Sequence, residues 1–207
     1  MIAVSKTHPP EAVREAYAAG QRDFGENYAQ ELASKASELL PLEGLRWHMI
    51  GHLQRNKARL IAGHAELVHG VDSVELAAEL GKRRRALPEF DPARPLGCLI
   101  EVNIAGEGSK SGLAPDAIEP VLAAVEARAE LALRGLMCIP PYSDDPAASR
   151  AHFDALAALR ERHGGAARLP ELSMGMSADF ESAIAAGATL VRVGTAIFGE
   201  RPPKPDR

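Results

Sequence analysis

The sequence has few aromatic residues, few cysteines and no excess of basic residues. Phe, Trp and Tyr make up 4% of its 207 residues, which argues against the aromatic stacking surfaces that hold single-stranded nucleic acids. The formal net charge of −4 argues against a surface that follows a phosphate backbone. The two cysteines, Cys98 and Cys138, form no Cys-x-x-Cys motif, so we expect reduced core thiols and neither a disulfide nor a metal site. These absences predict a protein without a nucleic-acid partner.

Long apolar runs are missing as well. No stretch approaches the roughly 20 residues that a membrane-spanning helix needs, and the chain does not open on the basic-then-apolar pattern of a leader. We therefore expect a cytoplasmic protein that makes no membrane contact. The length suits one α/β domain, so residues 1–207 are predicted to form a single domain. Because no large apolar surface is indicated, that domain is predicted to be a monomer.

Short apolar runs alternate with helical patterns along the whole chain. The eight runs that predict strands are 2–5, 23–25, 47–50, 67–70, 98–103, 133–137, 171–174 and 190–193. Helical periodicity is clearest over 116–129 and 147–162, and a third helix is predicted from about residue 177 to 187. This alternation predicts parallel strands with right-handed crossovers, either in an open doubly wound sheet or in a (β/α)8 barrel.

Polar residues follow the ends of nearly all the predicted strands. They are Lys6, Glu26, Asn27, His52, Asp72, Ser73, Asn103 and Thr195, with Gly51, Cys138, Gly175 and Gly194 beside them. An open sheet would gather such residues at one switch point, whereas barrels place their sites around the whole C-terminal face. The first strand is also not followed by the Gly-x-Gly-x-x-Gly of dinucleotide-binding folds. The sequence therefore favours the barrel.

Lys6, at the end of the first predicted strand, is the leading candidate for chemistry. Partial burial near other cations lowers the pKa of a lysine amine, which then attacks carbonyl carbons and forms Schiff bases. The simpler interpretation is a solvated strand end. What favours the first is a possible phosphate site after the seventh and eighth strands, where Gly175, Ser177, Gly194 and Thr195 offer N–H groups and hydroxyls. Ser177 is also expected to cap the helix that follows it.

Arg192 lies inside an apolar strand, so its guanidinium needs a buried acceptor. Two interpretations stay open. The first is a structural salt bridge to Glu101 or Glu171. The second is a hydrogen bond to the aromatic nitrogen of a phosphorylated cofactor whose aldehyde reaches Lys6.

As a set, these residues resemble the pyridoxal phosphate homeostasis proteins, which are single-domain relatives of the alanine racemase barrel. The matching segments are Ala-Val-Ser-Lys-Thr at 3–7, Phe-Gly-Glu-Asn-Tyr at 24–28, Trp-His-Met-Ile-Gly-His-Leu-Gln at 47–54 followed by Asn56 and Lys57, Glu-Val-Asn-Ile at 101–104, Ser-Lys-Ser-Gly at 109–112, Arg-Gly-Leu-Met at 134–137 and the run 172–199. The resemblance covers nearly the whole chain and implies the barrel of the alanine racemase N-terminal domain, which is fold type III among enzymes that use pyridoxal phosphate.

The resemblance also implies a cofactor and the residues that bind it. Pyridoxal 5'-phosphate would form a reversible Schiff base with Lys6, and Arg192 would face its pyridine nitrogen. Its phosphate would be held by Ser177, Gly194 and Thr195, and its ring would be lined by Asn27 and by residues near Met49 and His52. Lys57 and Lys110 are further candidates for contacts at the rim, with exposed lysines as the simpler interpretation. No metal ligand and no catalytic residue are expected.

The function implied is intracellular homeostasis of pyridoxal phosphate, in which the protein stores the cofactor with little or no turnover and passes it to apoenzymes that require it. An arginine keeps its own proton, so the pyridine stays neutral and is a weaker electron sink. Racemases of this fold also need a tyrosine from an additional β domain, for which the sequence leaves no room, and no motif positions Tyr17, Tyr28 or Tyr142 as that base. The alternatives are a racemase or decarboxylase of the same fold and a Schiff-base aldolase acting on a sugar phosphate.

One difference from the family concerns the first strand. Family members carry a helix before the lysine strand, whereas this chain starts directly at the strand. We therefore expect thin cover between the eighth and first strands, with Ile2, Ile197 and Phe198 exposed.

Overall fold

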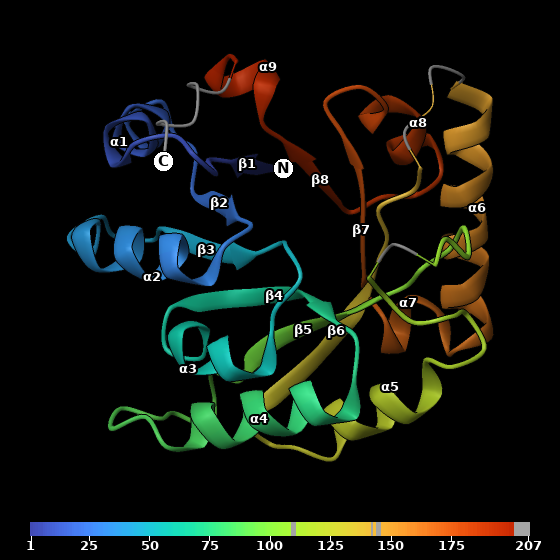
Figure 1. The fold of residues 1–207 in the computed structure, drawn as a ribbon, viewed down its shortest axis with the longest axis horizontal. Coiled ribbons are helices and arrows are strands. Elements are labelled where there is room, and N and C mark those ends of the chain that lie inside the picture. The colour runs from blue at the N-terminus through green and yellow to red at the C-terminus, as the bar shows by residue number, and fades with distance from the viewer. Residues whose placement is uncertain (109–110, 142, 144–145, 201–207) are drawn as a thin grey trace.

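Eight parallel strands close into a barrel in the computed structural model, which describes residues 1–108, 111–141, 143 and 146–200. The strands follow chain order around the barrel, and β8 lies beside β1 (Figure 1). The pairing of these two strands sets Ile2 opposite Arg192. Their bounds are β1 Ile2–Val4, β2 Asp23–Glu26, β3 Arg46–Met49, β4 Ala65–Val71, β5 Leu96–Glu101, β6 Leu131–Met137, β7 Glu171–Met176 and β8 Leu190–Val193. Each of the eight predicted runs overlaps one of these strands, so the predicted (β/α)8 barrel is confirmed.

Helices surround this barrel (Figure 1). Their bounds are α1 Pro10–Ala18, α2 Ala29–Glu38, the 3-10 turn η1 Arg55–Lys57, α3 Ala58–Ile61, α4 Val74–Arg85, α5 Glu119–Glu126, α6 Pro146–Arg162, α7 Gly165–Arg168, α8 Phe180–Ala185 and α9 Thr195–Phe198. The predicted helix over 147–162 matches α6. The one predicted over 116–129 is shorter, because Pro120 suits a first turn and α5 begins at Glu119. Within the described ranges, no helix is long and apolar enough to cross a bilayer.

The main hydrophobic core lies between the barrel and its helices. Phe24 and Met49 point outward from the strands into it, and Leu32 meets them from α2; all three side chains are almost completely buried. Each such side chain contributes about 1.5–3 kcal/mol by leaving water. Because parallel strands are covered on both faces, they form continuous apolar runs, as in β5, where every residue is buried.

The barrel interior holds a second and smaller set of side chains. Leu67, Leu99 and Met137 form an apolar cluster there, with Leu190 packed against it. Since side chains alternate along a strand, the neighbours of outward-pointing residues point inward. This alternation brings His48 and His69 inside, and it explains their burial despite their polarity.

The cover between β8 and β1 differs from the expectation at Ile2. Ile2 is completely buried, because β1 is paired on both sides and Ile2 fills, with Ile50, the space beside the missing Cβ of Gly25. The prediction that Ile2 would be exposed is therefore wrong. Ile197 in α9 is exposed as expected, whereas Phe198 is half-buried and its ring lies 5.2 Å from that of His8.

Candidate functional site

A cavity of about 390 Å³ opens at the C-terminal ends of the strands. Six of the eight residues proposed from the sequence line it, namely Lys6, Asn27, Ser177, Arg192, Gly194 and Thr195. The cavity is also lined by His8, Ile50 and Ile139, which the sequence did not single out. The structure therefore brings together residues from both ends of the chain, because β1 and β8 are neighbours in the closed barrel.

Met49 and His52 are not among the residues that line this cavity. Met49 is 1% exposed and belongs to the outer core, because His48 points into the barrel and the next residue along the strand must point out. Ile50 takes the place in the cavity wall that was expected near Met49. His52 lies farther along the loop after β3 and lines neighbouring cavities instead.

The backbone on either side of Lys6 is held by a buried ionic network. Lys35 Nζ donates to the Ser5 carbonyl at 2.7 Å, to Glu26 Oε1 at 2.7 Å and to Glu31 Oε1 at 2.8 Å. The Ser5 hydroxyl also donates to Glu26 Oε1. Thr7, which follows Lys6, has a positive φ of 67° and donates its N–H to Glu31 Oε1. These contacts fix the loop from which Lys6 reaches the cavity.

Two carboxylates in this network differ in burial. Burial raises the pKa of Glu26 to about 7, and the nearby Lys35 ammonium acts in the opposite direction.

This network was not predicted from the sequence, although Glu31 and Lys35 have the i, i+4 spacing of a helical ion pair. Nothing in the sequence showed that Lys35 faces inward, because a lysine in a short helix is usually solvated.

Arg192 is 4% exposed and is held by neutral acceptors. Its guanidinium donates to Ser173 Oγ at 2.6 Å and to the Cys138 carbonyl at 2.9 Å. Neither Glu101 nor Glu171 forms a salt bridge with it, and no other described carboxylate does. The structural salt bridge considered from the sequence is therefore wrong. Burial lowers the pKa of Arg192 from its ordinary value, but an arginine remains protonated in proteins.

Behind Arg192, hydrogen bonds continue through the barrel interior. Ser173 Oγ lies 2.8 Å from His69 Nδ1, and His69 Nε2 lies 3.1 Å from His48 Nδ1. His48 Nε2 in turn lies 3.1 Å from Asp23 Oδ1. Burial lowers the pKa of His69 well below its ordinary value, and the nearby Arg192 guanidinium acts in the same direction. His69 is therefore neutral and donates through one nitrogen only.

One arrangement of protons satisfies all of these groups. His48 donates through Nε2 to Asp23, His69 donates through Nε2 to His48, and Ser173 donates its hydroxyl to His69 Nδ1. Ser173 Oγ then accepts from Arg192. Burial acts to raise the pKa of Asp23, but hydrogen bonds from His48 and Arg46 outweigh it and lower the pKa, which keeps this end of the chain ionised.

The loops after β7 and β8 meet at the cavity. Gly194 N–H donates to Ser177 Oγ at 3.4 Å. Gly175 has a φ of +90°, and a Cβ there would lie 2.5 Å from the Ala183 Cβ, so the loop needs glycine to approach α8. The prediction that Ser177 caps α8 is wrong. Asp179 occupies that position, and its Oδ1 accepts the Met176 N–H at 2.6 Å.

Lys57 and Lys110 were two further candidates from the sequence. Lys57 lines a separate cavity of about 350 Å³ next to His52, and Lys110 lies outside the described residues. Of the tyrosines, Tyr17 donates its hydroxyl to the Glu43 carbonyl and Tyr28 is exposed, while Tyr142 also lies outside the described residues. Neither described tyrosine lines the Lys6 cavity.

Both the sequence and the structure of this chain are similar to those of known proteins. A family model described as the N-terminal domain of alanine racemase matches residues 1–202. A protein of Pseudomonas aeruginosa named pyridoxal phosphate homeostasis protein is 49% identical over 203 residues, which are 97% of this chain and 84% of the relative. The Escherichia coli K12 protein of the same name is 45% identical over 208 residues, covering 97% of this chain and 85% of the relative.

Solved structures show the same likeness. PipY of Synechococcus elongatus, in a structure with PLP bound, superposes with a TM-score of 0.82 at 41% identity, covering 96% of this chain and 91% of that chain. Alanine racemase from E. faecalis superposes with a TM-score of 0.70 at 17% identity, covering 97% of this chain and 53% of that chain. The second likeness concerns the fold alone.

Proposed function

The chain belongs to the family of the pyridoxal phosphate homeostasis proteins, whose barrel is the alanine racemase N-terminal domain, and we propose that it binds pyridoxal phosphate in the Lys6 cavity. It holds the cofactor reversibly and passes it to apoenzymes that require it. The observation that carries this proposal is the meeting of Lys6, a buried Arg192 and the Ser177–Gly194 contact around one cavity of about 390 Å³.

The residues of the cavity fit the chemical groups of this cofactor. Pyridoxal phosphate supplies an aldehyde that combines reversibly with a primary amine, and Lys6 provides the amine. Arg192 offers an N–H donor to a ring nitrogen. Ser177, Gly194 and Thr195 offer the hydroxyls and N–H groups with which proteins bind phosphate. Asn27 and Ile50 line the wall beside the ring position.

Arg192 also supports a storage role over turnover. It stays protonated and is held by Ser173 and the Cys138 carbonyl, so it binds a ring nitrogen without giving up a proton. An amino-acid racemase needs a second acid or base opposite the lysine. Among the described residues that line the cavity, His8 is the one other residue of a type that commonly acts as a general acid or base. We therefore expect little or no turnover, with His8 as the residue on which any racemisation would depend.

The first experiment locates the cofactor linkage. The purified protein is mixed with pyridoxal phosphate, its visible absorption spectrum is recorded, the linkage is reduced with borohydride and the peptides are mapped by mass spectrometry. We expect a chromophore and a modification at Lys6, both lost in Lys6→Ala and both kept in the control Lys57→Ala. Modification spread evenly over several lysines, or no chromophore at all, would refute the proposal and favour the Schiff-base aldolase.

A second experiment separates storage from catalysis. The loaded protein is incubated with an apoenzyme that requires pyridoxal phosphate, and separately with free amino acids in deuterated water. We expect recovery of the apoenzyme's activity and no deuterium at the amino-acid α carbon. Deuterium exchange that disappears in His8→Gln would instead show that the protein is a racemase of this fold. Sedimentation of the loaded protein by itself tests the expected monomer.

A further inference from the structure

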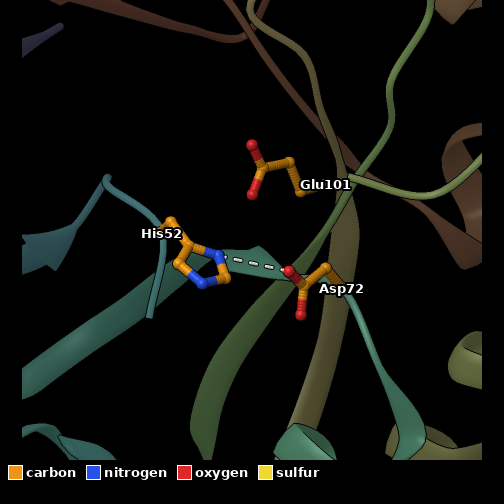
Figure 2. A group of neighbouring side chains, drawn as sticks. All are labelled: His52, Asp72 and Glu101. Atoms are coloured by element: carbon orange, nitrogen blue, oxygen red, sulfur yellow. Dashed lines mark ion pairs between the residues drawn. The ribbon is translucent and has the colours of Figure 1, made fainter. Parts of the chain in front are cut away.

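Three potential metal ligands meet beside the Lys6 cavity, at the ends of three neighbouring strands (Figure 2). His52 comes from the loop after β3, Asp72 follows β4 and Glu101 ends β5. One ligand atom from each residue lies within 4.8 Å of the others, and His52 Nδ1 lies 3.3 Å from Asp72 Oδ2. Because β3, β4 and β5 are adjacent in the barrel, closure of the sheet brings these side chains together.

Glu101 is the member of this cluster that requires an explanation. Glu101 is 7% exposed and its carboxylate lies beside the other two side chains (Figure 2), and its buried Oε2 atom has no hydrogen-bond partner among the described residues. A buried carboxylate oxygen without a partner is costly, and Asp72 places a second negative charge nearby. The missing side chain of Gly70 leaves room for Oε2, since a Cβ there would lie 3.2 Å from it. The pocket is thus shaped around a carboxylate whose Oε2 atom no described residue satisfies.

The distance between His52 and Asp72 suits two ligands of one metal ion better than a hydrogen-bonded ion pair. Charge-assisted N–H···O bonds measure about 2.7–2.9 Å, and the 3.3 Å between His52 and Asp72 is longer. Two ligand atoms on a tetrahedral zinc ion, each about 2.0–2.2 Å from the metal, lie about 3.3–3.5 Å apart. One imidazole and two carboxylates are a ligand set used for zinc and similar divalent ions.

We propose that His52, Asp72 and Glu101 bind a divalent metal ion of the zinc type. The proposal is independent of the function proposed above. His52 is half-exposed and gives the ion an entry path. A fourth position would face the cavity of about 310 Å³ that His52 and Glu101 line, and that cavity shares Asn27, Ile50 and Ile139 with the Lys6 cavity. The metal site would therefore adjoin the cofactor site.

Two simpler occupants compete with a metal. A proton on Glu101 would relieve the charge, and in the metal-free cluster burial raises the pKa of Glu101 to about 7, with the Asp72 charge adding to the effect. An organic ammonium would also be attracted. A proton satisfies one oxygen and leaves His52 unused, whereas a metal engages all three side chains. An ammonium needs several hydrogen-bond acceptors, and a neutral imidazole offers only one.

The test is a titration of the whole purified chain, stripped with a chelator and free of pyridoxal phosphate, with Co²⁺ and then Zn²⁺. We expect one equivalent of Co²⁺ to produce visible d–d absorption, and Zn²⁺ to displace it. Glu101→Gln and His52→Gln should each weaken the affinity at least about 10-fold, since even residues that only orient the ligands change affinity by 10–100-fold. The matched control is Glu119→Gln, at a surface cluster where Arg168 and His163 already engage both glutamate oxygens.

Three results would overturn the proposal. The first is no Co²⁺ absorption and no Zn²⁺ binding in the unmodified protein. The second is binding that Glu101→Gln and His52→Gln leave unchanged. The third is a Glu101→Gln variant that melts at a higher temperature while the unmodified protein binds no ion, which would show that a proton is the occupant. His52→Gln alters a half-exposed side chain, so it keeps the test valid if Glu101→Gln fails to fold.

Discussion

Ser173 joins Arg192 to the histidines of the barrel interior, so its replacement by alanine tests the whole chain of hydrogen bonds. The variant removes an acceptor 2.6 Å from the Arg192 guanidinium and the partner of His69 Nδ1 at 2.8 Å. A hydrogen bond to a charged group contributes about 1.5–3 kcal/mol, and one between neutral groups about 0.5–1.5 kcal/mol. Because Arg192 keeps the Cys138 carbonyl, we expect a loss somewhat below the full sum, about 2–4 kcal/mol of unfolding free energy.

The assay is urea and thermal unfolding of the cofactor-free protein. At about 2–4 °C per kcal/mol for a chain of this size, the melting temperature should fall by about 4–16 °C. Affinity for pyridoxal phosphate should fall as well, because Arg192 is less firmly oriented. The control is Ser37→Ala, an exposed hydroxyl on α2 that donates to the Ala33 carbonyl, with an expected change within about 0.5 kcal/mol. If the two variants unfold alike, the buried chain contributes nothing and the reasoning is wrong.

Three further predictions concern residues near the site. Lys35→Met removes the cation beside the buried Glu26 and should cost about 3 kcal/mol of unfolding free energy in urea, whereas an unchanged midpoint would show that the network is not stabilising. The lowered pKa of His69 gives stability that is complete above about pH 6.5 and is lost as the pH falls. The raised pKa of Glu26 acts oppositely, giving stability that is complete below its unfolded value of about 4.5 and is lost as the pH rises through about 7. Because the His69 contribution is the one lost on acidification, His69→Gln should flatten the fall in unfolding free energy between pH 7.5 and 5.5. A plot of unfolding free energy against pH that runs parallel to that of the unmodified protein would contradict this. Gly175→Ala should lower the melting temperature more than Gly20→Ala, since both have positive φ but only the first meets other atoms.

The barrel could be predicted from the sequence because its signals are local. A parallel strand covered on both faces forms a short apolar run, and polar residues after such runs mark the C-terminal face. Lys6, Ser177 and Arg192 were found in this way, since each stands at or near a strand end. Met49 shows the limit of the method. A shift of one residue along a strand moves a side chain to the other face, and Ile50 lines the cavity instead.

The interior chain could not be predicted, because its members meet only when the barrel closes. Asp23, His48, His69 and Ser173 come from four different strands, and no spacing in the sequence links them. A weak signal was present, since two histidines inside apolar runs must find buried partners. Lys35 was missed because a lysine in a helix is expected to be solvated, whereas the structure shows its ammonium bonded to the Ser5 carbonyl.

The fate of Arg192 links the cofactor site to the proposed metal site. From the sequence, Glu101 was a candidate salt-bridge partner for this arginine, and such a pair would have neutralised both groups. In the structure Ser173 and the Cys138 carbonyl engage Arg192, so Glu101 Oε2 has no partner among the described residues, and the Glu101 carboxylate lies beside His52 and Asp72. The same contacts with Ser173 and Cys138 hold the Arg192 guanidinium at the Lys6 cavity, where it can bind a ring nitrogen. Weakening the Ser173 contact should therefore draw Arg192 toward Glu101 and reduce the affinity of both sites together, which separate sites would not do.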